Sequence, residues 1–202
     1  MATFLVDMDS VCNDLWAPLL AGMNKEFDKS YTIGDVKSWD LHANFPGYIV
    51  EWIHERVRSP GFFRKLPIRE GCYDALQEIN NIHKVIIVTA HPGGFWRSQY
   101  YHSNKMDWVA ENLSFMKPEQ VVFTATKNIV RGDVLVDDAP KNLKEFDRIT
   151  IAFDHPYNRK SPATFRAKSW DDVRFILLEI GSLLNSGTRR EDIWKAPIYL
   201  PE

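Results

Sequence analysis

Short apolar runs rich in β-branched residues recur along the chain, and a polar cluster follows each of them. Such runs are typical of strands that are buried on both faces of a parallel sheet. The pattern predicts four strands: Thr3–Val6, Val85–Val88, Val134–Val136 and Ile149–Phe153. Because ligands of open α/β sheets bind beyond the carboxyl ends of the strands, the polar clusters predict a site at that edge.

Helical spacing of apolar residues separates these runs. The segments with this spacing are 15–27, 48–57, 71–80, 101–112, 142–146 and 171–184, the last closed by Gly187. We therefore expect an α/β fold with a Rossmann-like core, residues 1–13 and 68–187, whose central parallel sheet is flanked by helices. Residues 14–67 contain no convincing buried strand, so we interpret them as a small helical cap inserted after the first strand. Residues 188–202, with charges followed by Pro197 and Pro201, are expected to form a surface tail.

The composition argues against a nucleic-acid-binding, secreted or membrane-anchored protein. With 25 basic and 27 acidic residues among 202, the formal charge is -2, which gives no basic field for a nucleic-acid polymer. The first residues lack a positive leader and no segment reaches membrane-spanning length, so we expect neither a signal peptide nor a membrane anchor. Cys12 and Cys72 fit no zinc or disulfide spacing. These features favour a reduced, cytoplasmic protein.

Two acidic pairs follow predicted strands. Asp7 and Asp9 lie two residues apart, so an extended chain directs both to one side, and Asp137-Asp138 follows the third strand. Hard cations such as Mg²⁺ prefer carboxylate oxygens, and two strand ends can supply them. Either pair taken alone is equally consistent with helix capping or a turn.

Thr89 and Lys127 complete the set of candidate residues. The hydroxyl of Thr89, at a strand end, can bind a phosphate oxygen, and the ammonium of Lys127 can offset the charge of phosphate and carboxylates. Taken singly, a strand-end threonine and a solvated lysine are both commonplace.

In this order and spacing, the elements Asp7-Met8-Asp9-Ser10-Val11, Thr89, Lys127 and Asp137-Asp138 resemble the haloacid dehalogenase (HAD) superfamily of phosphatases. The chain is most similar to the 5′(3′)-deoxyribonucleotidases, from Phe4 to about Trp170. The stretch Pro60-Gly61-Phe62-Phe63 and the pair Lys105 and Trp108 are also similar to that family.

The resemblance implies a Mg²⁺-dependent phosphoryl transfer. Asp7 would be the nucleophile that forms an aspartyl-phosphate, and Asp9 the general acid and base. The metal would bind Asp7, the backbone carbonyl of Asp9, Asp137 and Asp138. Thr89 and Lys127, with Lys105 as a further candidate, would hold the phosphoryl oxygens.

Three positions depart from the family pattern. Ser10 stands where glycine is usual, so a positive φ there would strain the turn. Ala90 stands where many nucleotidases have serine, and Ala125 where the mammalian enzymes have arginine. These departures affect the expected phosphate binding and substrate preference.

The expected cap is rich in aromatic residues. Any of them could stack on a nucleobase or fill the core of the cap, and Trp39, flanked by polar residues, is the preferred candidate for the base. The set is Trp16, Trp39, Phe45, Trp52, Phe62 and Phe63. His91 and His155, near strand ends, are further candidates for substrate contact.

We therefore expect an enzyme that hydrolyses (deoxy)ribonucleoside monophosphates, a small-molecule substrate. The alternatives are a HAD phosphatase of another small phosphomonoester and a non-catalytic nucleotide-binding regulator. A homodimer is one assembly compatible with the sequence.

Overall fold

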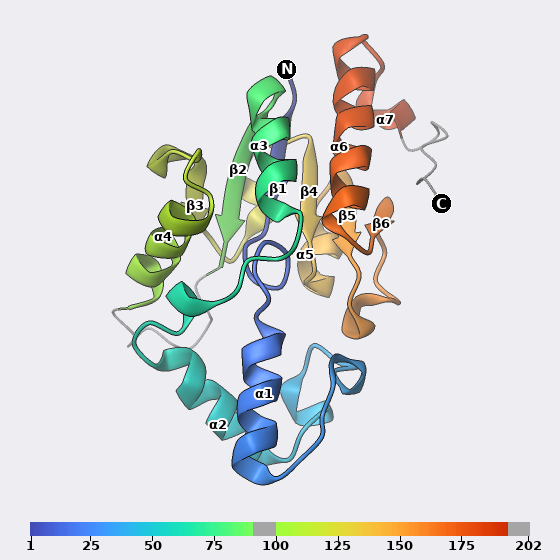
Figure 1. The fold of residues 1–202 in the computed structure, drawn as a ribbon. Helices are drawn as coiled ribbons and strands as arrows, with labels where there is room; N and C mark the ends of the chain where they lie inside the picture. The colour runs from blue at the N-terminus through green and yellow to red at the C-terminus, as the bar shows by residue number, and fades with distance from the viewer. Residues whose placement is uncertain (91–99, 194–202) are drawn as a thin grey trace.

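A six-stranded parallel sheet forms the centre of the computed structural model, which describes residues 1–90 and 100–193 (Figure 1). The strand order is β3-β2-β1-β4-β5-β6. The strands are β1 (Thr3–Val6), β2 (Lys84–Thr89), β3 (Val121–Phe123), β4 (Val134–Asp137), β5 (Ile149–Phe153) and β6 (Phe165–Ala167). The expected α/β fold with a central parallel sheet is confirmed, and the four predicted strands are its four central ones.

Seven α-helices connect and flank the strands within the described residues. They are α1 (Trp16–Phe27), α2 (Gly47–Arg58), α3 (Cys72–Ile82), α4 (Tyr101–Asn112), α5 (Pro140–Glu145), α6 (Trp170–Asn185) and α7 (Arg190–Ile193). Each predicted helix corresponds to one of the first six, and no boundary differs by more than two residues. None of these helices is long and apolar enough to cross a membrane.

The sheet separates two hydrophobic clusters because alternate residues of each strand face opposite sides. Phe4 and Val6 of β1 pack with residues of α3, α4 and α6, whereas Leu5 packs on the other side with Phe146, which follows α5. Both faces of the central strands are therefore covered, and their carboxyl ends are left open to ligands.

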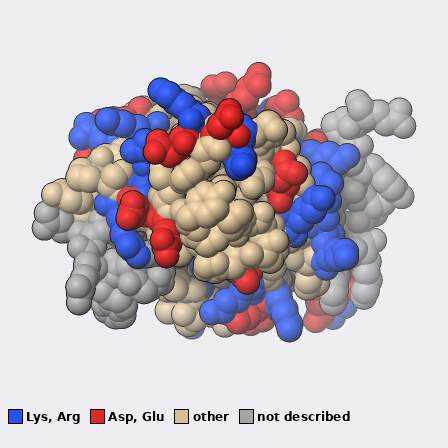
Figure 2. Space-filling view, turned by 90° about the horizontal axis from the view of Figure 1, so that it is seen from below, with Lys and Arg blue, Asp and Glu red and all other residues tan. Residues whose placement is uncertain are grey.

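The segment 14–67 contains α1 and α2 and lies below the carboxyl edge of the sheet in Figure 1. It has its own hydrophobic cluster, in which Leu19 and Met23 of α1 pack against Ile49 and Ile53 of α2. We refer to it as the cap segment. Seen from this end, uncharged residues occupy the middle of the face, and charged residues of both signs surround it (Figure 2).

Two short edge strands, β3 and β6, were not predicted. Each has three residues, and most of their side chains are only half buried. The predicted tail reaches into residues 194–202, which, like His91, lie outside the described residues.

Candidate active site

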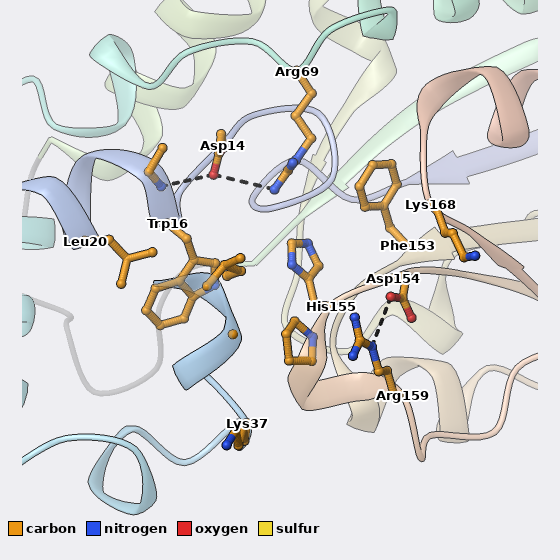
Figure 3. A pocket seen from close by; sticks show the side chains of 14 residues that line it. Asp14, Trp16, Leu20, Lys37, Arg69, Phe153, Asp154, His155, Arg159 and Lys168 are labelled. Carbon is orange, nitrogen blue, oxygen red and sulfur yellow. Dashed lines mark hydrogen bonds and ion pairs between the residues drawn. The ribbon is translucent and has the colours of Figure 1, made fainter. Parts of the chain in front are cut away.

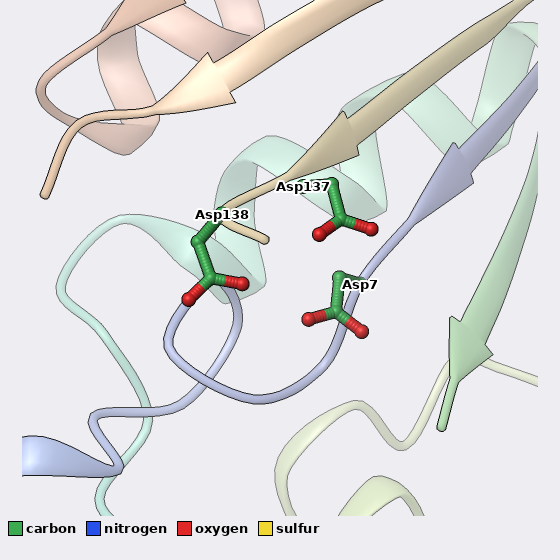
Figure 4. A group of neighbouring side chains, drawn as sticks. All are labelled: Asp7, Asp137 and Asp138. Carbon is green, nitrogen blue, oxygen red and sulfur yellow. The ribbon is translucent and has the colours of Figure 1, made fainter. Parts of the chain in front are cut away.

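Three carboxylates meet beyond adjacent strands, as Figure 4 shows. Asp7 directly follows β1, Asp137 ends β4, and Asp138 comes next in the chain. The backbone N–H of Asp7 donates to the carbonyl of Val136 at 2.9 Å, which keeps the two strand ends side by side. One oxygen from each carboxylate lies within 4.8 Å of one from each of the others. The structure thus brings together three of the four predicted acidic residues.

Lys127 lies between two of these carboxylates. Its Nζ contacts Asp7 and donates to Oδ2 of Asp137 at 2.7 Å, and the residue is only 3% exposed. Burial disfavours the charge on Lys127, but the carboxylates of Asp137 and Asp7 outweigh burial and raise the pKa of the ammonium. Lys127 therefore stays charged and balances part of the acidic cluster.

Burial and neighbouring negative charges raise the pKa values of two of these carboxylates, Asp7 and Asp138. Burial, followed by the charges of Asp137 and Asp9, raises the pKa of Asp7 to about 7, although Lys127 opposes this shift. Burial and the charges of Asp7 and Asp137 likewise raise the pKa of Asp138. Protein groups alone therefore do not fully compensate the three carboxylates.

Two further residues orient the acidic cluster, and the sequence analysis had not assigned them to the site. Asn142 donates to Asp137 through Nδ2 at 3.0 Å, and the hydroxyl of Tyr157 donates to Asp138. Tyr157 lies in a loop after β5, and Asn142 in α5, so both contacts depend on the fold. The available signal for Tyr157 was its position just after the predicted strand Ile149–Phe153, at the edge where a site was expected.

Asp9 does not belong to the cluster of Asp7, Asp137 and Asp138 and has hydrogen-bond partners of its own. Nδ2 of Asn13 donates to Oδ1 of Asp9 at 3.1 Å, and Lys105 of α4 binds Oδ2. Lys105 is fully buried, and its Nζ also donates to Oγ1 of Thr89 at 2.7 Å and to the carbonyl of Ala90 at 2.9 Å. All three ammonium hydrogens of Lys105 thus have protein acceptors, and its charge is fixed beside Asp9.

The turn between Asp7 and Asp14 explains how Asp9 is presented. Ser10 has a φ of 62°, so the strain that the sequence analysis anticipated at this position is present. The carbonyl of Ser10 accepts from Nε2 of His155 at 2.9 Å and from Nε of Arg69 at 3.2 Å. These two donors hold the turn in its left-handed conformation.

A cavity of about 320 Å³ connects this acidic edge to the cap segment. Its lining includes Asp7, Asp9 and Lys127 on one side and Trp39, Ile53 and His54 on the other. Trp39 is 56% exposed and meets Tyr157 edge to face, with 5.5 Å between ring centroids. The cavity is large enough for a small phosphorylated molecule with an apolar portion.

Most other aromatic residues of the cap segment have packing partners. Trp16 and Phe45 are buried in its hydrophobic cluster, Phe63 joins the main core, and Trp52 covers Gly22. Trp16 and Phe63 also present part of their surface to the cavity, where they line it with Trp39. Among the predicted aromatic residues, Trp39 is the exposed one that lines it.

The donor set fits a hard divalent cation. Three carboxylates within 4.8 Å of one another provide oxygen ligands, and burial, followed by the neighbouring carboxylates, raises the pKa of Asp7 and of Asp138. No sulfur or imidazole belongs to this cluster in the described residues. The cluster therefore suits Mg²⁺ better than Zn²⁺.

Comparison with known families and proteins gives consistent matches. The model of a family described as 5′ nucleotidase, deoxy (pyrimidine), cytosolic type C protein matches residues 1–181. A 5′(3′)-deoxyribonucleotidase of Clostridium acetobutylicum is 26% identical over 174 residues, which is 85% of this chain and 92% of that protein. One of Bacillus subtilis is 28% identical over 178 residues, 86% of this chain and 96% of that protein.

Solved structures support the fold. The magnesium-bound HAD-hydrolase YfnB of Bacillus subtilis superposes with a TM-score of 0.55 at 12% sequence identity, and the match covers 87% of this chain and 98% of that one. At this identity the likeness concerns the fold alone. It agrees with the parallel sheet and helical layers described above.

Proposed function

The chain belongs to the family of 5′ nucleotidases, deoxy (pyrimidine), cytosolic type C, within the HAD fold, and on that premise we propose that it hydrolyses deoxyribonucleoside monophosphates. It is a phosphomonoester hydrolase, as are the deoxyribonucleotidases that it matches over most of its length. The observation that carries the proposal is the convergence of Asp7, Asp9 and Lys127 on one cavity edge, with Thr89 joined to Asp9 through Lys105 just behind it.

Catalysis proceeds in two steps in this proposal. The carboxylate of Asp7 attacks phosphorus, an aspartyl-phosphate bond forms, and the ester P–O bond breaks. Asp9 gives its proton to the leaving alkoxide. In the second step Asp9 takes a proton from water, the water oxygen attacks phosphorus, and the bond to Asp7 breaks to release inorganic phosphate.

The remaining residues hold these two carboxylates and the phosphoryl group. Lys127 and Thr89 bind phosphoryl oxygens, a role supported by the place of Thr89 at the end of β2 and by the contacts of the Lys127 ammonium with Asp7 and Asp137. Lys105 has three protein acceptors, which supports a part in orienting Asp9 in addition to the phosphate contact expected from the sequence. Without such fixed charges, phosphomonoester hydrolysis is among the slowest of reactions.

Mg²⁺ would be held by the carboxylates of Asp7, Asp137 and Asp138 and by the carbonyl of Asp9. Bound there, it would supply positive charge that keeps Asp7 ionised and offsets the charge of the phosphoryl group. The excess negative charge of the cluster supports this assignment.

The cap segment covers the leaving group in this proposal, and the base stacks on Trp39. The exposure of Trp39 beside the cavity supports that role. The two buried free thiols, Cys12 and Cys72, are compatible with a reducing cytoplasmic setting.

The test is phosphate release from a panel of 5′- and 3′-deoxyribonucleotides, ribonucleotides and sugar phosphates. We expect release from deoxyribonucleotides with Mg²⁺, none with chelator, and none from the Asp7→Asn variant. Release from sugar phosphates alone would refute the nucleotide substrate and leave the phosphatase chemistry. Binding of nucleotides without any release would instead favour a regulator, a role that has no need of the acid and base Asp9.

A further inference from the structure

A second, larger cavity of about 690 Å³ has a lining that includes none of Asp7, Asp9, Asp137 and Asp138 (Figure 3). One wall comes from the cap segment, with Trp16, Leu20 and Lys37. The other wall comes from the end of β5 and the segments that follow β5 and β6, with Phe153, Arg159 and Lys168. The chemistry proposed above uses none of the charged groups of this cavity.

Basic side chains are in excess in this cavity. Lys37, Arg69, Arg159 and Lys168 line it, against two acidic residues among the described lining. These are Asp14, which pairs with Arg69 at 3.5 Å, and Asp154, which pairs with Arg159 at 3.2 Å and with Arg166 at 3.1 Å. Both carboxylates therefore already have basic partners.

Lys37 and Lys168 are the basic residues of this lining that take no part in the ion pairs just described. Both are exposed, and in the described part of the chain neither forms an ion pair within 4 Å of a carboxylate. Lys37 belongs to the cap segment and Lys168 to the turn between β6 and α6, so they face the cavity from opposite walls (Figure 3). Like charges on two walls repel each other, and a small polyanion between them removes that repulsion.

The cavity is coupled to the catalytic turn through two residues. Arg69 lines it and donates through Nε to the carbonyl of Ser10, the residue that follows Asp9. Trp16 lines both this cavity and the 320 Å³ cavity that holds the carboxylates. An anion that competes for Arg69 therefore weakens a contact that holds the left-handed turn of Ser10.

We propose that this cavity is a regulatory site for a small molecule that carries a polyphosphate chain, and that its occupancy slows turnover by drawing Arg69 from Ser10. A chain of two or three phosphates is longer and more highly charged than a single phosphate, so it is the anion better matched to basic groups on two walls. The shared chemistry fits inorganic tripolyphosphate and nucleoside triphosphates alike. The binding site stands on its own, whereas the effect on turnover rests on the proposed function.

Binding is tested by calorimetry with tripolyphosphate and with a deoxynucleoside triphosphate, in chelator. Without a divalent cation the acidic active site repels polyanions, so heat reports on the basic cavity. We expect Lys37→Glu and Lys168→Glu each to weaken binding by roughly tenfold, because each reverses a charge that faces the anion. Lys117→Glu is the control, since Lys117 is exposed beside β3 at the far edge of the sheet.

A response to both anions assigns the site to the polyphosphate chain, and a response to the triphosphate alone assigns it to nucleotides. Absence of binding, or equal weakening by Lys117→Glu, would overturn the site. The regulatory part is tested by hydrolysis of p-nitrophenyl phosphate with Mg²⁺ well in excess of tripolyphosphate. We expect kcat to fall at saturating substrate, and this effect to be lost in the Lys37→Glu and Lys168→Glu variants.

Purely competitive inhibition that persists in both variants would place the anion at the active site and overturn the regulatory claim. Failure of the proposed function has a different signature. In that case, the unliganded wild-type protein releases no phosphate from any nucleotide, while calorimetry still detects binding to the basic cavity.

Discussion

His155 donates from Nε2 to the carbonyl of Ser10 at 2.9 Å and so joins a loop after β5 to the catalytic turn after β1. Ser10 has a φ of 62°, a conformation that costs a non-glycine residue roughly 1–2 kcal/mol. His155 is 4% exposed, and its ring stacks on Tyr157 with an interplanar angle of 4°. The turn that presents Asp9 is thus maintained by a buried imidazole.

This strain predicts opposite effects for two substitutions of Ser10. Ser10→Gly removes the conformational cost and should raise the free energy of unfolding by about 0.5 kcal/mol, the gain being reduced by greater freedom of the unfolded chain. Ser10→Val should lower it by about 2 kcal/mol, because a β-branched residue tolerates positive φ least. Urea denaturation measures both. Equal stabilities for the two variants would contradict a strained turn.

Stability should depend on pH through His155. Burial lowers the pKa of its imidazole to about 4, so the folded protein keeps this ring neutral where the unfolded chain protonates it. The unfolded state therefore binds more protons between the usual pKa of histidine and about 4, and stability falls as pH falls through that window. This single group should contribute a loss of about 2 kcal/mol between about pH 7.5 and pH 5.

The matched variant is His155→Gln, whose amide can still donate to Ser10 but does not titrate. Urea denaturation of both proteins over this pH range isolates the contribution of the imidazole, because the acidic cluster is common to the two. We expect the stability advantage of the wild type to shrink toward acidic pH. A constant difference would show that His155 titrates equally in both states.

Lys127 should be essential to stability as well as to turnover. Lys127→Met leaves Asp7 and Asp137 buried without their shared cation, and such a loss costs about 3 kcal/mol. Lys127→Arg keeps the charge but changes its shape, so it should retain more stability while losing most activity. Thermal unfolding and nucleotide hydrolysis of the two variants separate the effects. Full stability in Lys127→Met would mean that the carboxylates do not need this partner.

Mg²⁺ should raise the melting temperature of the protein. At a hundredfold excess over its dissociation constant, a ligand that binds only the folded state adds about 2.7 kcal/mol, or roughly 5–10 °C for a chain of this size. Asp137→Asn should abolish most of this shift, and Asp147→Asn should leave it unchanged, since Asp147 is exposed far from the cluster. The same shift in Asp137→Asn would remove that residue from the metal site.

The sequence predicted the central strands because β1, β2, β4 and β5 are buried on both faces and read as continuous apolar runs. The edge strands were missed for the converse reason. All three side chains of β3 are half buried, so Val121–Phe123 has neither a long apolar run nor a clear alternation. The pattern of apolar and polar residues carries little information about secondary structure where the side chains are only partly buried.

The site was predictable to the extent that it depends on strand ends. Asp7 and Asp137 had to meet because parallel neighbouring strands end at one edge. The contacts of Lys105 were not predictable in the same way, because no local rule determines where α4 packs relative to Thr89 and Ala90. Asn142 and Tyr157 became site residues only through tertiary packing.

Substitutions of Trp39 and Trp16 test how the cap segment recognises the substrate. Trp39 is 56% exposed beside the cavity, whereas Trp16 is 8% exposed and packs in the cluster of the cap segment. Trp39→Ala should therefore raise KM for deoxyribonucleotides about tenfold, the equivalent of one lost base stack, with little change in thermal stability. Trp16→Ala should instead destabilise the fold by about 3 kcal/mol.

A substrate without a base separates stacking from general damage to the site. Hydrolysis of a sugar phosphate by Trp39→Ala should proceed at close to the wild-type rate, because the proposed function places the phosphoryl group against Lys127 and Thr89 and not against Trp39. Trp39→Phe keeps an aromatic face and should restore part of the affinity for nucleotides. If Trp39→Ala impaired all substrates equally, Trp39 would be acting on the catalytic carboxylates through Tyr157, and base recognition would have to lie elsewhere in the cavity.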